Sequence, residues 1–178
     1  MYNMKVPVSL TSLLNYGGNF FSVENKVSFS PVFQEHPYIS EDPVFGYTKA
    51  EDVRTWIETL NPDDPDAYEV GIVLKSTGEL IGSGGIYYKP ETGLWTIGYN
   101  LRKDQWGNGY AVEMIRGLIE YARSQREVRG ITGTFANENT RSRRVMEKLG
   151  MAFLEDVTLS KLDGSAAYPG KRYGKLFG

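Results

Sequence analysis

The sequence predicts an α+β fold in which helices pack on a mixed sheet. Three segments with the composition and alternation of strands follow one another closely at 68–75, 79–89 and 93–101. The apolar spacing then changes to that of a helix and returns to a strand pattern at 129–136. Because a strand, a helix and another strand in this order form a right-handed parallel crossover, we expect both parallel and antiparallel pairs in the sheet.

The first part of the chain has the weakest pattern. Residues 1–47 carry scattered aromatic residues and show no sustained period. The segment 48–60 opens with a capping box formed by Thr48 and Glu51, and we expect it to be an amphipathic helix. Its apolar face consists of Val53, Trp56, Ile57 and Leu60.

The three strand segments are separated by the turn sequences STGE and PETG, which predicts an antiparallel meander. A helix of about four turns follows, with a charged face opposite an apolar one. The apolar face consists of Ala111, Ile115, Leu118 and Ala122. After the strand at 129–136 we expect a helix at 139–149 closed by Gly150, and then strands at 151–162 and 171–177.

Length and charge limit the function classes. The chain of 178 residues suits one compact domain, and its net charge of −2 offers no field that would attract nucleic acid or an anionic membrane. No apolar run approaches the roughly 20 residues that cross a bilayer, and the start lacks the features of a signal peptide. We therefore expect a cytoplasmic protein without nucleic-acid or membrane partners.

Composition also excludes several kinds of chemistry. The chain has no cysteine and a single histidine, His36, in the loop-like segment QEHPY. A cysteine nucleophile, a disulfide and a thiolate zinc site are excluded, and no second histidine completes a metal site or a triad. We expect no metal. Any acyl transfer must then proceed by direct attack of the substrate on a bound thioester.

The clearest motif lies between the strand at 93–101 and the long helix, in LRKDQWGNGYAVE. Gly107 and Gly109 flank Asn108 where a helix begins, so several backbone N–H groups can point at one anion, as in a pyrophosphate cradle. The alternative is that the two glycines only ease a tight turn. A dinucleotide motif would need a third glycine where Val112 stands, and a triphosphate loop would need a lysine and a hydroxyl that are absent.

The sequence resembles the GNAT N-acetyltransferases, and within them the RimJ/RimL branch, in IGYNLRKDQWGNGYAVEMI and NENTRSRRVMEKLGMAF. Trp106, Gly109 and Ala111 fill the loop pattern of the superfamily, and a tryptophan in the first place is typical of this branch. The resemblance covers roughly 68–160. It implies a single GNAT domain over 1–178 with a cofactor-binding core at 68–160 and a divergent part at 1–47.

The resemblance implies the GNAT fold, which is α/β (α+β), with a mixed, mostly antiparallel sheet splayed at the cofactor site and helices on both faces. It also implies acetyl-CoA as co-substrate, with the pantetheine arm between the third and fourth strands of the segments above. The N–H of Leu101 would then donate to the thioester carbonyl. Asn139 would contact the pantetheine or the adenosine, although it is equally suited to cap a helix. The pyrophosphate would lie on the loop formed by Trp106, Gly107, Asn108, Gly109, Tyr110 and Ala111.

The residues at the positions of the general acid and the general base differ from those usual in the family. Many members supply the thiolate with a proton from a tyrosine where this chain has Met146. RimL-like enzymes are proposed to use a serine at the place of Ser142, which the resemblance therefore assigns to the thiolate and the cofactor site. Ser142 is otherwise suited to bind local backbone groups. The general base is also missing from its usual place, because the branch usually carries a glutamate where Thr96 stands. Glu113 is the remaining carboxylate in the matched segment, and it is more suited to a salt bridge with Arg116.

The acceptor site has no motif in this sequence, because 1–47 lacks the Leu-x-Leu-Arg pattern with which the branch begins. Aromatic residues on the strands are candidates for an amine pocket, although such residues more often serve packing. They are Tyr87, Tyr88, Trp95 and Tyr99. Three functions stay open: acetylation of a protein N-terminus or of a small amine such as a polyamine or an antibiotic, acyl-CoA binding without catalysis, and a structural domain with a coincidental turn. A homodimer also stays open.

Overall fold

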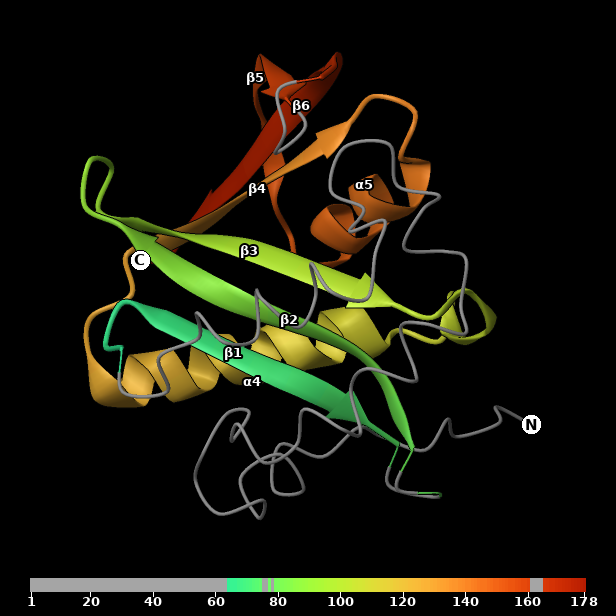
Figure 1. Ribbon diagram of the computed structural model, residues 1–178. Helices are drawn as coiled ribbons and strands as arrows, with labels where there is room; N and C mark the ends of the chain where they lie inside the picture. Colours follow the sequence, from blue (N-terminus) through green and yellow to red (C-terminus); the bar gives the residue numbers. More distant parts are fainter. Residues whose placement is uncertain (1–63, 75–76, 78, 161–164) are drawn as a thin grey trace.

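The computed structural model describes residues 64–74, 77, 79–160 and 165–178. The predicted helix at 48–60 and the divergent part at 1–47 lie outside the described residues. The elements in chain order are β1 Ala67–Val73, β2 Leu80–Lys89, β3 Leu94–Leu101, the 3-10 turn η3 Lys103–Gln105, α4 Tyr110–Gln125, β4 Gly130–Ala136, α5 Thr140–Lys148, β5 Ala152–Ser160 and β6 Ala167–Leu176 (Figure 1).

The described strands form a mixed, mostly antiparallel sheet in the order β1-β2-β3-β4-β6-β5. The predicted meander of β1, β2 and β3 is confirmed, and β3 and β4 form the parallel pair. That pairing is short, since it joins only Trp95 to Ile131 and Thr96 to Thr132. Beyond these residues the two strands separate toward their carboxyl ends (Figure 1), so the predicted splay is confirmed.

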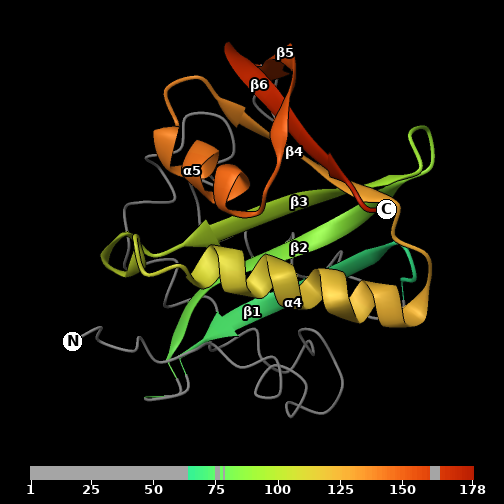
Figure 2. The same cartoon turned by 180° about the vertical axis from the view of Figure 1, so that it is seen from behind.

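Both described helices pack on the same face of the sheet, where Figure 2 shows them in front of the strands. The predicted apolar face of α4 is confirmed, because its four residues are at most 4% exposed: Ala111, Ile115, Leu118 and Ala122. The two helices are joined where Arg116 donates to the carbonyl of Lys148 at 3.1 Å. Within the described part of the chain, Arg116 forms no ion pair with Glu113, so the expected salt bridge is replaced by this bond between helices.

The last strand begins earlier than the sequence indicates. β6 starts at Ala167 rather than at 171, because the segment that contains Pro169 and Gly170 continues the pairing with β5. Proline donates no hydrogen bond and usually marks the end of a strand, so its presence hides this extension from a local pattern. The Pro169 carbonyl still accepts a bond from the Asn137 backbone N–H at 3.0 Å. Among the described helices, none is long and apolar enough to cross a membrane.

Candidate active site

The carboxyl end of β3 presents backbone groups to the gap between β3 and β4. The Arg102 backbone N–H donates to the Ile81 carbonyl of β2 at 2.9 Å. Because neighbouring residues of an antiparallel ladder point to opposite sides, the N–H and the carbonyl of Leu101 point away from β2. The Nε1–H of Trp106 donates a hydrogen bond to the Leu101 carbonyl at 2.8 Å. The Leu101 N–H therefore points toward the gap, which is the direction that its predicted role requires.

The loop before α4 holds an open approach to the start of that helix. Gly107 and Gly109 have φ angles of 80° and 89°, and a Cβ on either residue would meet none of the described residues within 4 Å. Gly109 is the N-cap of α4, and no side chain caps the helix. The first bond within the helix runs from the Glu113 N–H to the Gly109 carbonyl at 3.0 Å. The N–H groups of Tyr110 and Ala111 thus have no acceptor within the helix, as an anion site requires.

The side chains of Tyr110 and Ala111 are buried in the core, so both residues anchor the helix start and offer only their backbone to the loop. Asn108 turns back onto the loop, where its Nδ2 donates to the Gln105 carbonyl at 3.2 Å. The loop also contains an acid, Asp104, but Arg102 binds it at 2.7 Å and lowers the pKa of Asp104 to about 2. This ion pair balances a negative charge that would otherwise repel an anion nearby.

The start of α5 contributes the other predicted residues. Asn139 is the N-cap of α5, and its Oδ1 accepts from the Ser142 N–H at 3.0 Å, so the capping interpretation is confirmed. The Ser142 carbonyl accepts from the Tyr99 hydroxyl at 3.5 Å, whereas the Ser142 hydroxyl itself bonds to none of the described residues. Burial raises the pKa of Tyr99 to about 12, so this hydroxyl stays a donor at neutral pH. Tyr99 thereby holds the first turn of α5 to β3, two residues before Leu101.

A cation that the sequence analysis missed lies between the two halves of this site. The guanidinium carbon of Arg141 lies 3.9 Å from the centroid of the Trp106 ring, so the start of α5 contacts the loop before α4. The contact brings Trp106 and Ser142 to one end of the sheet together with Leu101. The available signal was the group of basic residues Arg141, Arg143 and Arg144 shortly after the Asn139 cap, but the partner of Arg141 is set only by the tertiary fold.

Both departures from the family now have a structural explanation. The hydroxyl of Thr96 lies 3.0 Å from that of Thr132, so the two residues join β3 to β4 at the last pair before the splay. Met146 is 2% exposed, and its methyl group lies against Gly133 of β4. Thr96 and Met146 therefore serve the fold.

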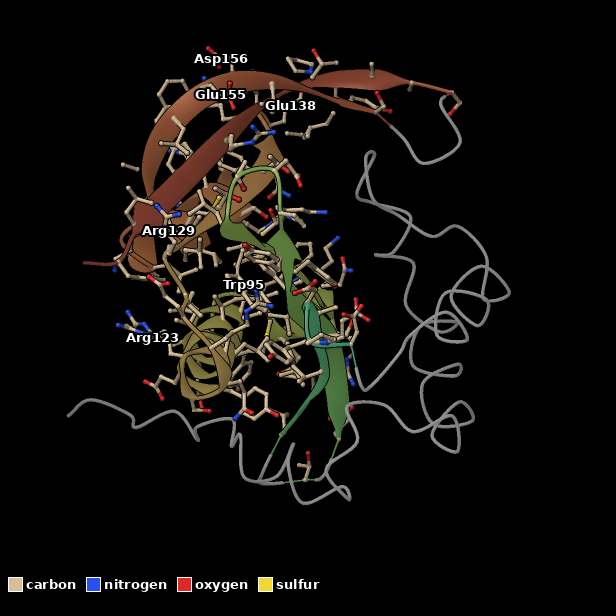
Figure 3. All side chains as sticks on the ribbon, turned by 90° about the vertical axis from the view of Figure 1, so that its left-hand side faces the viewer. Trp95, Arg123, Arg129, Glu138, Glu155 and Asp156 are labelled. Carbon is tan, nitrogen blue, oxygen red and sulfur yellow. The ribbon has the colours of Figure 1, made fainter. Side chains whose placement is uncertain are left out.

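The four aromatic residues that were candidates for an amine pocket divide between the two faces of the sheet. Tyr88, Trp95 and Tyr99 are on the helix side, where Trp95 is fully buried and lies close to α4 (Figure 3). Trp95 also stacks on Tyr68 with the ring centroids 5.3 Å apart. These three are packing residues, as aromatic side chains on strands usually are. Tyr87 alone among the four points to the opposite face, by the alternation of β2.

Comparisons with known proteins identify the family. The profile of the Acetyltransferase (GNAT) domain matches residues 30–152. The uncharacterized N-acetyltransferase p20 of Bacillus licheniformis is 30% identical over 113 residues, which make up 63% of this chain and 63% of that protein. The chain thus spans 63% of the length of each of the first two curated relatives it matches.

Solved structures share the fold at low identity. RimL, the ribosomal L7/L12 α-N-protein acetyltransferase solved with coenzyme A, has a TM-score of 0.76 at 14% identity over 97% of both chains. The microcin C7 self-immunity acetyltransferase MccE, solved with acetyl-CoA and AMP, has a TM-score of 0.75 at 14% identity, covering 89% of this chain and 90% of that one.

The chain belongs to the GNAT family of acetyltransferases. Members of this family are acyltransferases that use acetyl-CoA, and acetyl-CoA or CoA is bound in the MccE and RimL structures. The predicted family and fold are confirmed, and RimL is among the solved proteins that share the fold.

Proposed function

We propose that this protein moves an acetyl group from acetyl-CoA to an amine by direct attack within a ternary complex, as a member of the RimJ/RimL branch. The observation that carries the proposal is the splay of β3 and β4 beside the uncapped start of α4. A linear thioester fits the gap between two strands, and its pyrophosphate fits a helix start whose N–H groups lack acceptors within the helix. The residues present therefore suit acetyl-CoA.

Each predicted site residue has a role in this proposal. Acetyl-CoA supplies the activated acetyl thioester. The Leu101 N–H donates to the carbonyl oxygen, and the stabilisation grows as negative charge develops there. The loop from Trp106 to Ala111 binds the pyrophosphate, and the dipole of α4 contributes roughly 0.3 to 2 kcal/mol. Ser142 donates to the departing thiolate. Asn139 fixes the turn that carries Ser142, and it contacts the pantetheine or the adenosine.

The acceptor that suits the site best is an α-amine, such as a protein N-terminus. Thr96 replaces the glutamate that serves as a base in the branch, so an amine that is easily deprotonated has the advantage. An α-amine with a pKa of about 7.8 costs about 1 kcal/mol to deprotonate at pH 7, whereas a lysine-type amine at about 10.4 costs about 4.6 kcal/mol. The branch itself, which includes the ribosomal acetyltransferase RimL, supports the same class of acceptor.

A second candidate function is acyl-CoA binding without catalysis. It is favoured by Thr96 and Met146, which fill the family's base and acid positions and serve the fold instead. The two functions share the cofactor site and differ in turnover.

Acetyl-CoA is expected to stabilise the protein against heat. A ligand that binds only the native state adds about 2.7 kcal/mol to the free energy of unfolding at a hundredfold excess over Kd. The measurement is the melting temperature with and without millimolar acetyl-CoA. As a control, S-acetyl-N-acetylcysteamine carries the thioester without the pyrophosphate and should have little effect. An unmoved melting temperature with acetyl-CoA contradicts the cofactor assignment for both candidate functions.

Thiol release from acetyl-CoA separates the two candidates. With an amine panel that includes peptides with a free N-terminus, polyamines and aminoglycosides, we expect turnover with at least one class. Initial-rate lines should intersect when both substrates are varied, because no cysteine is available to hold the acetyl group and both substrates must bind together. Parallel lines with a trapped acetyl-enzyme contradict direct attack. Binding of acetyl-CoA without turnover of any amine supports the non-catalytic candidate.

A further inference from the structure

The sheet face turned away from α4 and α5 carries an acid that is held by a tyrosine. Tyr68 and Val70 of β1 are buried on the helix side, so Glu69 between them points to the opposite face. Tyr87 of β2 points to that same face, and its hydroxyl donates a hydrogen bond to Glu69 Oε1. The orientation of the carboxylate is therefore fixed by a neighbouring strand.

Two glycines, both contacted by the side chain of Tyr87, lead from this pair toward the splay. Glu69 pairs with Gly85 of β2, which in turn pairs with Gly98 of β3. A Cβ on Gly85 would lie 2.9 Å from Glu69 Cγ and 2.9 Å from the Tyr87 hydroxyl, so both side chains lean over this glycine. A Cβ on Gly98 would lie 3.5 Å from the Tyr87 ring. The two glycines thus form a row from Glu69 to β3, the strand that borders the gap.

The second oxygen of the carboxylate has no partner. Glu69 Oε2 is buried and accepts no hydrogen bond among the residues that the structure describes. Burial raises the pKa of Glu69 above its usual 4.5, and the bond from Tyr87 lowers it by less. Among the described residues, Tyr87 is the titratable group that faces Glu69, and Lys89 is exposed further along β2. A buried acceptor without a donor is unfavourable for the fold alone, and a visiting donor accounts for it.

We propose that Glu69 is the acid of the acceptor site, which binds the ammonium form of the amine through Oε2 and takes one of its protons. This inference rests on the proposed acetylation of an amine. It supplies the base that Thr96 cannot, since the Thr96 hydroxyl is engaged with Thr132. Gly98 of β3 lies about one strand spacing, roughly 4.8 Å, from Gly85, and Leu101 lies three residues, roughly 10 Å, further along β3. The deprotonated amine therefore moves past Tyr87 to reach the thioester.

The step balances in protons and electrons. The acceptor enters as an ammonium ion and gives one proton to the Glu69 carboxylate. The nitrogen lone pair then forms the C–N bond with the acetyl carbon, and the C–S bond breaks with its electron pair on sulfur. The second proton of the nitrogen passes to the thiolate. The products are the amide, the CoA thiol and a protonated Glu69, which returns its proton to solvent.

Replacement of Glu69 by glutamine keeps the size of the side chain and removes the base. For a tripeptide amide that begins with serine, we expect kcat/KM at pH 7 to fall roughly 100-fold or more, the range of a general base, with acetyl-CoA affinity unchanged. The matched control is Glu91→Gln, in the exposed turn between β2 and β3, which should act like the unmodified protein. A Glu69→Gln protein with kcat/KM within twofold of the unmodified one overturns the proposal.

The pH profile tests the Tyr87 contact. The hydrogen bond from Tyr87 lowers the pKa of Glu69, so Tyr87→Phe should raise that pKa further. Since the base acts in its ionised form, the acid limb of log kcat/KM should move to higher pH in Tyr87→Phe and disappear in Glu69→Gln. An acid limb that stays in place in both variants contradicts the role of Glu69.

A binding measurement separates this inference from the proposed function. In protein labelled with carboxyl-13C glutamate, the Glu69 resonance is assigned by its loss in Glu69→Gln. With CoA present, we expect this resonance to move on addition of n-butylammonium or of the serine peptide amide. If the unmodified protein acetylates no amine, only the proposed function fails. The Glu69 resonance then still shows whether Glu69 binds the amine. A resonance that neither ligand moves overturns the role of Glu69.

Discussion

A protein in which Ser142 is replaced by alanine is expected to acetylate amines roughly 10 to 1,000 times more slowly while it binds acetyl-CoA as before. The hydroxyl bonds to none of the described residues, so its removal leaves the fold intact. The start of α5 is held by the Ser142 N–H on Asn139 Oδ1, which alanine retains. The loss should therefore appear in kcat, as for a contact that forms with the departing thiolate.

The measurement is single-turnover acetyl transfer, which isolates the chemical step. Thr140→Ala is the matched control, because Thr140 carries an exposed hydroxyl in the same helical turn. It should leave kcat unchanged. If Ser142→Ala reacts at the normal rate when chemistry is limiting, Ser142 is only a helix-start residue and does not assist the departing thiolate.

Valine at position 109 is expected to weaken acetyl-CoA binding at least roughly tenfold, or about 1.4 kcal/mol. Gly109 stands at the start of α4 with φ of 89°, and a side chain there enters open space in front of the helix N–H groups. The branched side chain hinders the pyrophosphate. It also strains the backbone, because β-branched residues rarely adopt positive φ.

Strain and obstruction are separated by Gly93→Val. Gly93 lies in the turn between β2 and β3 with φ of 68°, where a Cβ would lie 3.5 Å from Arg129. Both variants should lose stability, as urea unfolding would measure, but only the valine at position 109 should reduce acetyl-CoA affinity in calorimetry. Equal affinities in both variants and in the unmodified protein remove Gly109 from the site.

The sequence was most informative where structure depends on neighbours along the chain. The meander and α4 follow from alternation and helical spacing, and the residues from Leu101 to Ala111 lie in one continuous motif. The extension of β6 through Pro169 was not predictable locally, because the pairing with β5 overrides the usual preference of proline.

The parts of the site that join distant segments were also hidden. Arg141 contacts Trp106 across 35 residues of sequence, and Glu69 meets Tyr87 across 18. Neither pair has a spacing rule, because strand register and helix packing bring them together. In the sequence, Glu69 is only one outward residue of an alternating strand. The register of β1 on β2 places it beside Tyr87 and Gly85.

The junction of β3 and β4 in the middle of the sheet is narrow. At this junction, two residue pairs, the contact between the Thr96 and Thr132 hydroxyls and the bond from the Thr132 hydroxyl to the Trp95 carbonyl join β3 to β4. The junction connects the half β1-β2-β3 to the half β4-β6-β5. The contacts of Arg116 with Lys148, of Tyr99 with Ser142 and of Arg141 with Trp106 also connect the two halves. An extended molecule that lies between β3 and β4 and forms hydrogen bonds to the backbone on each side would take the place of an absent strand. On the proposed function, the co-substrate is then also a part of the sheet, because it fills the place between β3 and β4 that no described strand takes.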